Sequence, residues 1–426
     1  MPTGTARPRV VIIGGGFGGL WAAKRLARAP VDVLLIDRRN HHVFSPLLYQ
    51  VATAGLSPGD IASPIRWILR SQHNLKVWLA DAKAVDVKRN VVQLADGEVA
   101  YDHLILAAGS QPTYFGHDDW AQHARGLKTL EDALAMRQKV LIAFERAERE
   151  PDRDKQRKLL TFVIIGGGAT GVELAGAVAE ISRHALTHEF RSIHPETARV
   201  ILIEGGPEVL ATYVPPLSAF ARRSLERLGV AVWTGTRVSA IESGLIRMGS
   251  ETLEAETILW AAGVVAAPIG ASLGAPLDRA GRVLINPDLT APGCERVYVV
   301  GDMASLNGAD GKPLPGVSQV AMQQASWAAD NIGRTIKGEA RTPFVYRNLG
   351  NMATIGRNKA IGDLGWIRIK GYFAWWFWLL LHIFWLIGFR NRLTVMTQWA
   401  FSYFTYQRST RLITGDDERW DDSPAA

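Results

Sequence analysis

The stretch Phe162-Val163-Ile164-Ile165-Gly166-Gly167-Gly168-Ala169-Thr170-Gly171 decides the fold of this chain. Its first four residues are apolar and predict a buried parallel strand. The glycines follow the spacing G-x-G-x-x-G, and residues 172–180 continue with the apolar spacing of a helix. In such a turn glycine lets the backbone approach a pyrophosphate, while the helix N-terminus supplies amide donors and positive potential. The stretch therefore predicts a dinucleotide-binding unit.

A second copy of this pattern lies near the N-terminal end of the chain. The apolar run Val10-Val11-Ile12-Ile13 leads into Gly14-Gly15-Gly16-Phe17-Gly18-Gly19, and a helix is expected over residues 20–29. One such match is a weak signal, but two in one chain support each other. Two dinucleotide cradles imply two bound dinucleotides and electron transfer between them.

Each cradle is followed by a strand that ends in an acid. Asp37 lies 23 residues after Gly14, and Glu204 lies 38 residues after Gly166, which implies a longer second helix. A carboxylate in this position accepts hydrogen bonds from the ribose hydroxyl groups of an adenosine. Glu204 would also repel a 2′-phosphate, so NADH is favoured over NADPH. For Asp37 the alternative is a surface acid that caps a turn.

Three further strands end in small residues, which let a cofactor approach the backbone closely. Residues 104–109 end in Ala108-Gly109, and residues 257–263 repeat that pattern up to Gly263. The repeat predicts two related domains, the second inserted into the first. Residues 296–302 end in Gly301-Asp302, where Asp302 can bind a polyol chain or can belong to a plain turn. Residues 75–79 and 91–94 predict a small antiparallel excursion.

The bulk composition limits the possible chemistry. A chain of 426 residues is expected to form two or three domains. The single cysteine, Cys294, excludes an internal disulfide and a redox-active dithiol. His41 and His42 are adjacent in the chain, so a shared metal site is disfavoured, and we expect them to be loop histidines that pack near a cofactor. No apolar signal region precedes Val10, so we expect the catalytic part to stay in the cytosol.

The net charge of +7 is concentrated near the C-terminal end. Residues 341–415 hold ten Lys or Arg against one acid, and residues 341–426 hold seven of the 14 tryptophans. Residues 372–389 form an uncharged run of eighteen residues that would reach about 27 Å as one helix, just short of a bilayer core of about 30 Å. Tryptophan favours the headgroup boundary, yet here it occupies the middle of the run.

The stretch after this run is amphipathic. We expect an apolar helix face that comprises Val395, Met396, Trp399, Ala400, Tyr403 and Phe404. The expected polar face comprises Thr394, Thr397, Gln398, Ser402 and Thr405. Four arginines flank the stretch: Arg390, Arg392, Arg408 and Arg411. An aromatic face with a cationic rim predicts helices that lie in the interface of an anionic membrane. A dimer surface and one true membrane span are the alternatives.

Taken together, these residues resemble the type II, single-subunit NADH:quinone oxidoreductases over nearly the whole chain. The most specific pieces are Asn40–Thr53, Gly166–Ala175 with Glu173, Ser318–Gln324, and Gly388–Arg392 before the amphipathic stretch. The resemblance implies non-covalent FAD in the first cradle, NADH as substrate in the second, and a quinone acceptor that enters from the membrane. It also implies a homodimer on the cytoplasmic face of the cell membrane, peripheral or monotopic, without proton pumping. No residues of the chain form the pattern of a metal site, and the positive charge lacks a nucleic-acid-binding motif.

The resemblance assigns roles to particular residues. Glu173 is implied as the acid near the nicotinamide and flavin, although an acid in the first turn of a helix is also favoured by the helix dipole. Gln319 and Gln323 match an Ala-Gln-x-x-x-Gln element beside flavin and quinone, with Ser318 in place of the alanine. The predicted FAD site comprises Gly14, Gly16, Phe17, Gly18, Gly19, Asp37, Arg38, Ala108, Gly109, Gly301 and Asp302. The predicted NADH site comprises Gly166, Gly168, Gly171, Glu204 and Gly263.

The expected fold class is α/β, with two Rossmann-like dinucleotide-binding domains and a C-terminal helical segment that associates with the membrane. We expect the FAD domain in residues 1–120 and 284–340, the NADH domain in residues 121–283, and membrane anchoring and dimerisation in residues 341–426. The cysteine count argues against sulfide:quinone oxidoreductase chemistry. A flavoprotein reductase with a soluble acceptor, a protein that senses NADH with little turnover, and a preference for NADPH are the alternative functions.

Overall fold

The computed structural model describes residues 7–405, 408 and 410–414, apart from the side chains of Phe389 and Arg390. The chain divides into two compact units, each assembled from three segments. The first unit comprises Met1–Val43, Ala62–Thr113 and Val264–Leu349. The second comprises Phe44–Ile61, Tyr114–Gly263 and Gly350–Ala426. Each unit contains a Rossmann-like sheet with helices, which confirms the predicted α/β class.

The first unit is built on a six-stranded sheet. Its strand order is β21 (Thr290–Ala291), β22 (Cys294–Val299), β9 (His103–Leu106), β1 (Arg9–Ile13), β2 (Asp32–Asp37) and β5 (Leu75–Leu79). All neighbours are parallel except β21 and β22. Four of the five residues of β1 are buried because the strand lies in the middle of the sheet, and this explains its unbroken apolar sequence.

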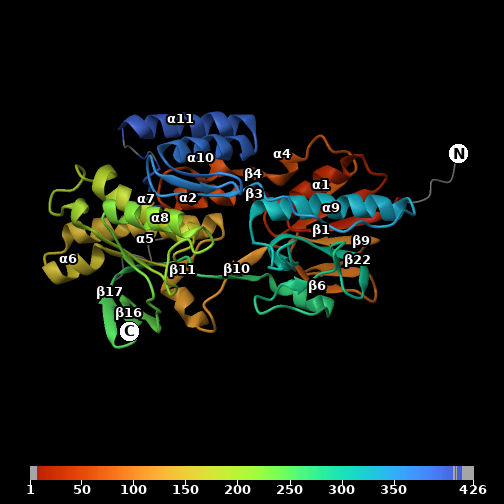
Figure 1. Ribbon diagram of the computed structural model, residues 1–426, viewed down its shortest axis with the longest axis horizontal. Helices are drawn as coiled ribbons and strands as arrows, with labels where there is room; N and C mark the ends of the chain where they lie inside the picture. Colours follow the sequence, from red (N-terminus) through yellow and green to blue (C-terminus); the bar gives the residue numbers. More distant parts are fainter. Residues whose placement is uncertain (1–6, 406–407, 409, 415–426) are drawn as a thin grey trace. The chain divides into compact units, whose positions relative to one another are not determined.

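Two helices of this unit, α1 (Phe17–Arg25) and α9 (Ser318–Ile336), lie side by side (Figure 1). Their buried residues are mostly small: Gly18, Gly19, Ala22 and Ala23 on α1, and Ala321, Ala325, Ala328 and Ala329 on α9. Small side chains allow two helix backbones to approach closely. The contact therefore places the start of α9 near the first glycine turn.

One strand prediction is wrong. β5 does not belong to an antiparallel excursion, because it pairs in parallel with β2 and forms the edge of the main sheet. The antiparallel sheet of this region is built instead from β6 (Ala82–Asp86), β7 (Val91–Leu94) and β8 (Gly97–Ala100). The direction of a short strand depends on its partner, and the partner of β5 lies about forty residues earlier in the chain.

The second unit contains a five-stranded parallel sheet. Its order is β11 (Ala124–Gly126), β18 (Thr257–Trp260), β12 (Thr161–Ile165), β13 (Arg199–Ile203) and β14 (Val230–Trp233). The helices of this unit include α2 (Leu48–Ala52), α5 (Leu130–Arg149), α6 (Arg153–Leu159), α7 (Ala169–Glu180) and α8 (Pro215–Arg227). As predicted, the helix after the second glycine turn is extended, because a π-helical segment, Ile181–Ala185, continues α7. Residues 240–254 form a separate three-stranded antiparallel sheet.

The C-terminal part of the second unit begins with a three-stranded antiparallel sheet: β24 (Asn351–Thr354), β25 (Ala360–Asp363) and β26 (Arg368–Gly371). Two helices follow, α10 (Tyr372–Trp385) and α11 (Phe389–Thr405), and they lie side by side (Figure 1). The uncharged run of residues 372–389 is therefore not one helix. α10 has fourteen residues and ends before Gly388, whose φ of +91° turns the chain into α11. Among the described residues, no helix is long and apolar enough to cross a bilayer.

The two faces of α11 differ from the predicted ones. Val395, Gln398, Trp399 and Ser402 are buried or half-buried, although Gln398 and Ser402 were expected on the polar face. The exposed residues include Leu393, Met396, Phe401 and Phe404. Hydrophobicity alone does not distinguish a face that packs on protein from one that faces outward. The inner face of α11 thus combines Val395 and Trp399 with polar side chains, whereas several large apolar side chains are exposed on its outer face.

Candidate functional site

The first glycine turn has the geometry of a phosphate cradle. Gly14 has a φ of +101°, and a Cβ there would lie 2.3 Å from the carbonyl oxygen of Ala107. A Cβ on Gly19 would lie 1.7 Å from the carbonyl oxygen of Gly14, so only glycine fits at either position. A Cβ on Gly16 would meet nothing within 4 Å. Open space thus lies at the N-terminus of α1, where no side chain caps the free amide groups.

Asp37, the acid at the end of β2, is hydrogen-bonded to this turn. The backbone N–H of Gly15 donates to Oδ2 of Asp37 at 2.5 Å, and the N–H of Arg39 donates to Oδ1 at 2.7 Å. The carboxylate is therefore held beside the turn, as a ribose ligand requires. Arg38, also predicted for this site, is exposed.

The second glycine turn repeats this geometry in the second unit. Gly166 has a φ of +110°, and a Cβ on Gly171 would lie 1.8 Å from the carbonyl oxygen of Gly166. Gly168 faces open space as Gly16 does. The N–H of Gly167 donates to Oε2 of Glu204 at 2.5 Å, and the N–H of Gly206 donates to Oε1 at 2.6 Å. The structure thus brings together the turn and the acid that the sequence predicts for NADH.

The other residues predicted for FAD lie at strand ends in the first unit. Gly109 follows Ala108 with a φ of +74°, and a Cβ there would meet nothing within 4 Å. Gly301 has a φ of +70°. The hydroxyl of Ser110 donates to Oδ2 of Asp302 at 2.5 Å, which ties the two strand ends together. Gly263, predicted for NADH, is exposed in the second unit with a φ of +80°.

Gln324 and His42 support the first cradle, although neither belongs to the site residues predicted from the sequence. Gln324 is buried, and its Oε1 accepts from the N–H of Gly301 at 2.7 Å. His42 is buried in a short strand, β3 (His41–Val43), rather than in a loop as expected. Gln324 directly follows Gln323, so the sequence shows that a second glutamine is present at this point of the helix. Helical spacing alone does not show which of the two glutamines points inward.

His42 presents an unused polar atom at the first cradle. Its Nδ1 lies 3.1 Å from the carbonyl oxygen of Gly15, and Phe17 packs edge-on against the ring. Burial lowers the pKa of His42 to about 4, so the ring is neutral at pH 7. With Nδ1–H donating to Gly15, Nε2 is an acceptor, and it is buried without a partner in the protein. Among the described residues, no group of three or more potential metal ligands gathers.

Glu173 lies in the second turn of α7. The N–H of Thr354 on β24 approaches its Oε1 at 3.4 Å, which is a weak interaction. Removal from water raises the pKa of Glu173 to about 8, and the weak contact with Thr354 lowers it only partly. The carboxyl can therefore hold a proton at neutral pH and release it near pH 8. Tyr213, whose pKa is raised by burial and then by the charge of Glu173, belongs to the same unit.

Gln319 and Gln323 lie on α9 in the first unit, and both bind the chain that follows this helix. Oε1 of Gln319 accepts from the N–H of Leu349 at 3.1 Å. Gln323 donates to the carbonyl of Arg347 at 2.9 Å and accepts from its N–H at 3.0 Å. The two glutamines thus bind the backbone of residues 347–349. Their contact with a quinone, which the family resemblance implies, stays a prediction.

Three of the four arginines predicted for the cationic rim bind protein groups. Arg408 pairs with Glu180 at 3.0 Å, and Arg411 pairs with Glu189 at 2.6 Å. Nε of Arg392 donates to the carbonyl of Leu386 at 2.7 Å. The side chain of Arg390 lies outside the described residues. Arg408 and Arg411 thus pair with acids of the same unit, while the large exposed side chains of α10 and α11 are apolar or aromatic.

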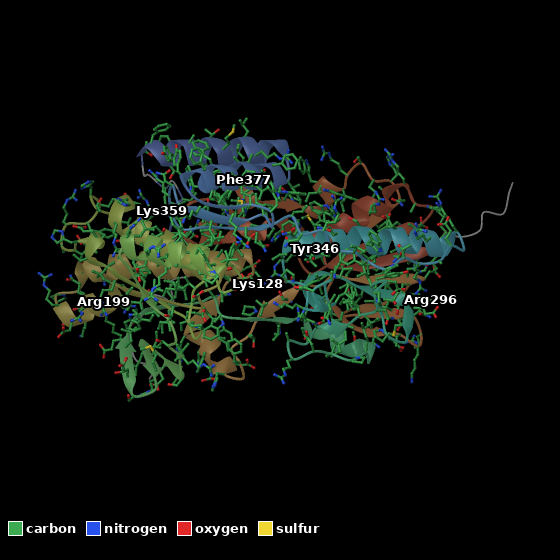
Figure 2. The ribbon with its side chains drawn as sticks, viewed as in Figure 1. Lys128, Arg199, Arg296, Tyr346, Lys359 and Phe377 are labelled. Carbon is green, nitrogen blue, oxygen red and sulfur yellow. The ribbon has the colours of Figure 1, made fainter. Side chains whose placement is uncertain are left out.

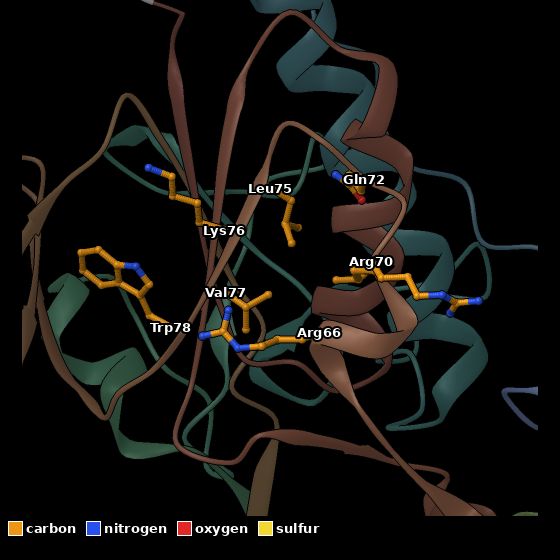
Figure 3. Close-up of a pocket in the computed structure, with 8 residues that line it drawn as sticks. Arg66, Arg70, Gln72, Leu75, Lys76, Val77 and Trp78 are labelled. Atoms are coloured by element: carbon orange, nitrogen blue, oxygen red, sulfur yellow. The ribbon is translucent and has the colours of Figure 1, made fainter.

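A cavity of about 400 Å³ lies beside β5 in the first unit (Figure 3). It is lined by Arg66, Leu69, Arg70, Gln72, Leu75, Lys76, Val77 and Trp78. The guanidinium of Arg70 donates to the carbonyl of Trp67 at 2.8 Å, and Figure 3 shows Arg70 and Lys76 pointing apart. None of the predicted cofactor residues lines this cavity, so it is separate from the residues of the cradle.

Comparisons with known proteins agree with this geometry. Residues 8–325 match the pyridine nucleotide-disulphide oxidoreductase family, and residues 348–407 match the NDH2 C-terminal domain. Two relatives from Mycobacterium tuberculosis are type II NADH:quinone oxidoreductases: NdhA is 44% identical and Ndh 42% identical, each over 96% of this chain and 90% of the relative. A solved structure of NDH2 from Plasmodium falciparum in complex with NADH superposes with a TM-score of 0.86 at 19% identity, covering 96% of this chain and all of that chain, and shows the same fold.

Proposed function

Because the chain belongs to the type II NADH:quinone oxidoreductases, enzymes that oxidise NADH and reduce quinone without proton pumping, we propose that it binds FAD without a covalent link in its first cradle and takes NADH in its second. The observation that carries this assignment is the repeated contact between a carboxylate and the middle glycine of each turn. Asp37 makes it with Gly15, and Glu204 makes it with Gly167. Each unit thus has a glycine turn for a pyrophosphate beside a carboxylate for a ribose, which supports the proposal.

The first cradle fits a resident flavin nucleotide. Open space at Gly16 accommodates the pyrophosphate, and Asp37 holds a ribose. The neutral His42 offers Nε2 as an acceptor to a hydroxyl group of the cofactor, which would satisfy this buried atom. FAD, when bound, supplies the ring that takes a hydride from NADH and passes electrons to the acceptor.

The second cradle fits NADH better than NADPH. Two backbone amides hold the Glu204 carboxylate where the ribose of the nucleotide is expected. Its negative charge would therefore repel the 2′-phosphate of NADPH. The residues that follow are Gly205 and Gly206, and neither offers a cation to the phosphate. Glu173 on the adjoining helix holds a proton near neutral pH, so we assign it as the acid that supplies or accepts a proton during turnover.

The quinone contact is assigned to the start of α9. Gln319 and Gln323 are half-buried amides, and an amide N–H is a suitable donor to a quinone carbonyl. Because both ends of the Gln323 amide bind Arg347, the role assigned to Gln323 is to hold the segment at Arg347 in place.

The outer face of α10 and α11 would dock on the cytoplasmic face of the membrane. Large exposed side chains gather there, including Phe377, which Figure 2 labels on α10: Tyr372, Phe373, Trp376, Phe377, Leu380, Phe384, Leu393, Met396, Phe401 and Phe404. A patch of this size marks a membrane or protein interface. Membrane docking is the proposed use, and the homodimer stays a prediction.

Membrane docking is tested with two charge substitutions on this face. Phe373 and Phe404 are 82% and 81% exposed, so F373E/F404E should fold normally. We expect several-fold less of this variant to pellet with vesicles, with unchanged reduction of a water-soluble quinone. F115E, which changes another exposed phenylalanine away from α10 and α11, should pellet as the unmodified protein does. Equal pelleting of all three proteins would refute membrane docking through this face.

The proposed reaction is tested by anaerobic addition of NADH to the purified protein, followed by a quinone. We expect flavin absorbance to bleach with NADH and to recover with the quinone. A protein that is isolated without flavin and takes up none would overturn the FAD assignment. Bleaching without recovery would instead indicate a protein that senses NADH or uses another acceptor.

A further inference from the structure

The cavity beside β5 offers positive charge that no protein group neutralises. Arg66 lies on the short helix α4 (Ile65–Ile68), Lys76 lies on β5, and both line the cavity. Among the described residues of the lining, none is acidic. Neither cation forms a hydrogen bond or an ion pair with another group in the part of the chain that the structure describes, and both are exposed. The cavity is therefore suited to an anion.

Arg70, the third cation of the lining, is already bound to protein. Its guanidinium donates to the carbonyl of Trp67 at 2.8 Å and lies over the Trp67 ring, at 4.5 Å from the centroid. Figure 3 shows Arg70 pointing away from β5, whereas the side chain of Arg66 extends toward this strand. Arg66 and Lys76 are thus the two cations that an anion in the cavity would meet.

The backbone of β5 adds a free donor and a free acceptor. The N–H of Val33 on β2 donates to the carbonyl of Asn74 at 2.8 Å, and the N–H of Ala80 donates to the carbonyl of Asp37 at 3.0 Å. Alternate residues of a strand bond to the same neighbour, so the even-numbered residues of this segment face β2. The N–H and C=O of Val77 therefore point away from β2, at the edge of the sheet, and Val77 lines the cavity.

Trp78 adds an aromatic surface to the same cavity. Its side chain lines the cavity and is 43% exposed, so part of the indole is free to contact a ligand. Because side chains alternate along a strand, Trp78 and Lys76 project from the same face of β5. A planar ring can stack on such an indole, and nucleobases do so whatever their identity.

These groups match the three parts of a nucleotide. We propose that this cavity binds a nucleoside monophosphate, with the phosphate at Arg66 and Lys76, the base edge at the backbone of Val77, and the base plane on Trp78. A nucleobase edge carries a hydrogen-bond donor beside an acceptor, which suits one free C=O and N–H. The volume of about 400 Å³ lies within the range of small-molecule sites, about 300–1,000 Å³.

This would be a third nucleotide site of the chain, in addition to the two cradles. It does not depend on the FAD and NADH assignments, because none of the predicted cofactor residues lines the cavity. A lysine on an edge strand also hinders pairing with another chain. That role explains Lys76, but it explains neither Arg66, which lies on a helix, nor the exposed indole of Trp78, which would favour association.

The test is calorimetric titration of AMP into flavin-loaded protein that carries G168A, because its methyl group fills the phosphate space of the second cradle. In this background R66Q/K76Q should weaken AMP binding at least tenfold, as expected for the loss of charge-assisted hydrogen bonds. R279Q/K88Q is the matched control, since it removes two exposed cations of the same unit that lie outside the cavity. Adenosine and ribose 5-phosphate, which each lack one part of AMP, should bind more weakly than AMP.

Photolabelling of the unmodified protein with an azido derivative of AMP locates the site directly, and we expect label on residues 65–79. Equal AMP affinity of R66Q/K76Q and R279Q/K88Q, or label confined to the two cradles, would overturn the proposal. If R66Q/K76Q does not fold, K76Q alone replaces it.

Two further ligands separate the nucleotide from other sources of phosphate. Inorganic phosphate that binds as tightly as AMP would show a simple anion site and would overturn the nucleotide assignment. If AMP does not bind, while R66Q/K76Q pellets less with phosphatidylglycerol vesicles than R279Q/K88Q does, the cavity takes a lipid headgroup instead. Failure of the proposed function is distinct, because the unmodified protein would then show no flavin bleaching with NADH.

Discussion

The two glycine cradles share one backbone geometry but differ in what surrounds it. In both, a left-handed first glycine and a last glycine that excludes any Cβ shape the turn, and an acid binds the middle N–H. The first cradle is supported by further segments of its unit: His42 binds Gly15, Gln324 binds Gly301, and Ser110 binds Asp302. The two turns thus share their backbone geometry, whereas the additional side-chain contacts around the first turn are consistent with the resident cofactor proposed for it.

A second difference lies seven residues after the first glycine of each turn. This position holds Trp21 in the first unit and Glu173 in the second. Trp21 lies below the ammonium group of Lys24, at 4.9 Å from the ring centroid, and has no acidic function. The equivalent helix position thus holds an aromatic side chain in the first unit and a titratable acid in the second. This difference supports the proposal that the second cradle carries the reactive acid and the first retains the cofactor.

The largest effect is expected from G19A and G171A. Each places a Cβ less than 2 Å from a backbone oxygen, so the turn must distort. We expect G19A to be purified with little or no flavin, whereas G171A should keep its flavin and lose bleaching by NADH by 100-fold or more. Flavin-to-protein absorbance ratios and anaerobic titration measure the two outcomes.

G16A and G168A serve as controls for folding in that experiment. A Cβ at either position meets no protein atom, so stability should be unchanged while the phosphate space is filled. If both G19A and G171A lost flavin equally with unchanged folding, the division into a resident and an exchanging site would be wrong.

The next effect concerns the acid of the second unit. E173Q should lower kcat by about 100-fold with flavin content unchanged, as expected for loss of a general acid or base. The exposed E208Q is the control. Since the pKa of Glu173 is raised to about 8, the rate limb near pH 8 should be absent in E173Q. A limb that persists unchanged would assign it to another group.

The same raised pKa predicts a stability effect of defined sign. The folded state binds the proton more tightly than the unfolded state, whose pKa is near 4.5, so this contribution is present below pH 4.5 and is lost as pH rises through 8. We expect the melting temperature of the unmodified protein to fall as the pH rises from about 5 to 8, and that of E173Q to fall less. Differential scanning fluorimetry at several pH values measures this.

A smaller effect is expected from His42 in the first cradle. H42N keeps a donor for the Gly15 carbonyl but lacks the buried Nε2 acceptor, so FAD should dissociate about tenfold more readily, the worth of one hydrogen bond. H73N, at an exposed histidine of the same unit, should bind FAD normally. Equal retention of flavin in H42N and H73N would show that Nε2 does not contact the cofactor.

An effect of similar size, on nucleotide preference and cofactor binding, is expected from the two acids that bind the glycine N–H groups. E204Q should reduce the preference for NADH over NADPH by roughly tenfold, since it removes a charge and keeps the length of the side chain. D37N should weaken FAD binding without changing nucleotide preference. Steady-state kinetics with both nucleotides, together with flavin retention, separate the two. Equal use of NADH and NADPH by the unmodified protein would contradict the role of Glu204.

The sequence by itself determined the two strand–turn–helix units, because a glycine turn between an apolar strand and a helix has few other solutions. It also indicated the family and the reaction, which the comparisons confirm. The places of Asp37 and Glu204 beside their turns followed from spacing, since each lies at the end of the strand next to its cradle.

Only the tertiary structure decided features that depend on partners distant in the chain. The direction of β5, the burial of His42 and the choice of Gln324 over its neighbours each depend on segments that local periodicity does not contain. The same holds for α11, where the sequence contains an amphipathic helix but not the information that Trp399 and Ser402 point inward. The period of a helix fixes which residues share a face, and only packing decides which face meets protein.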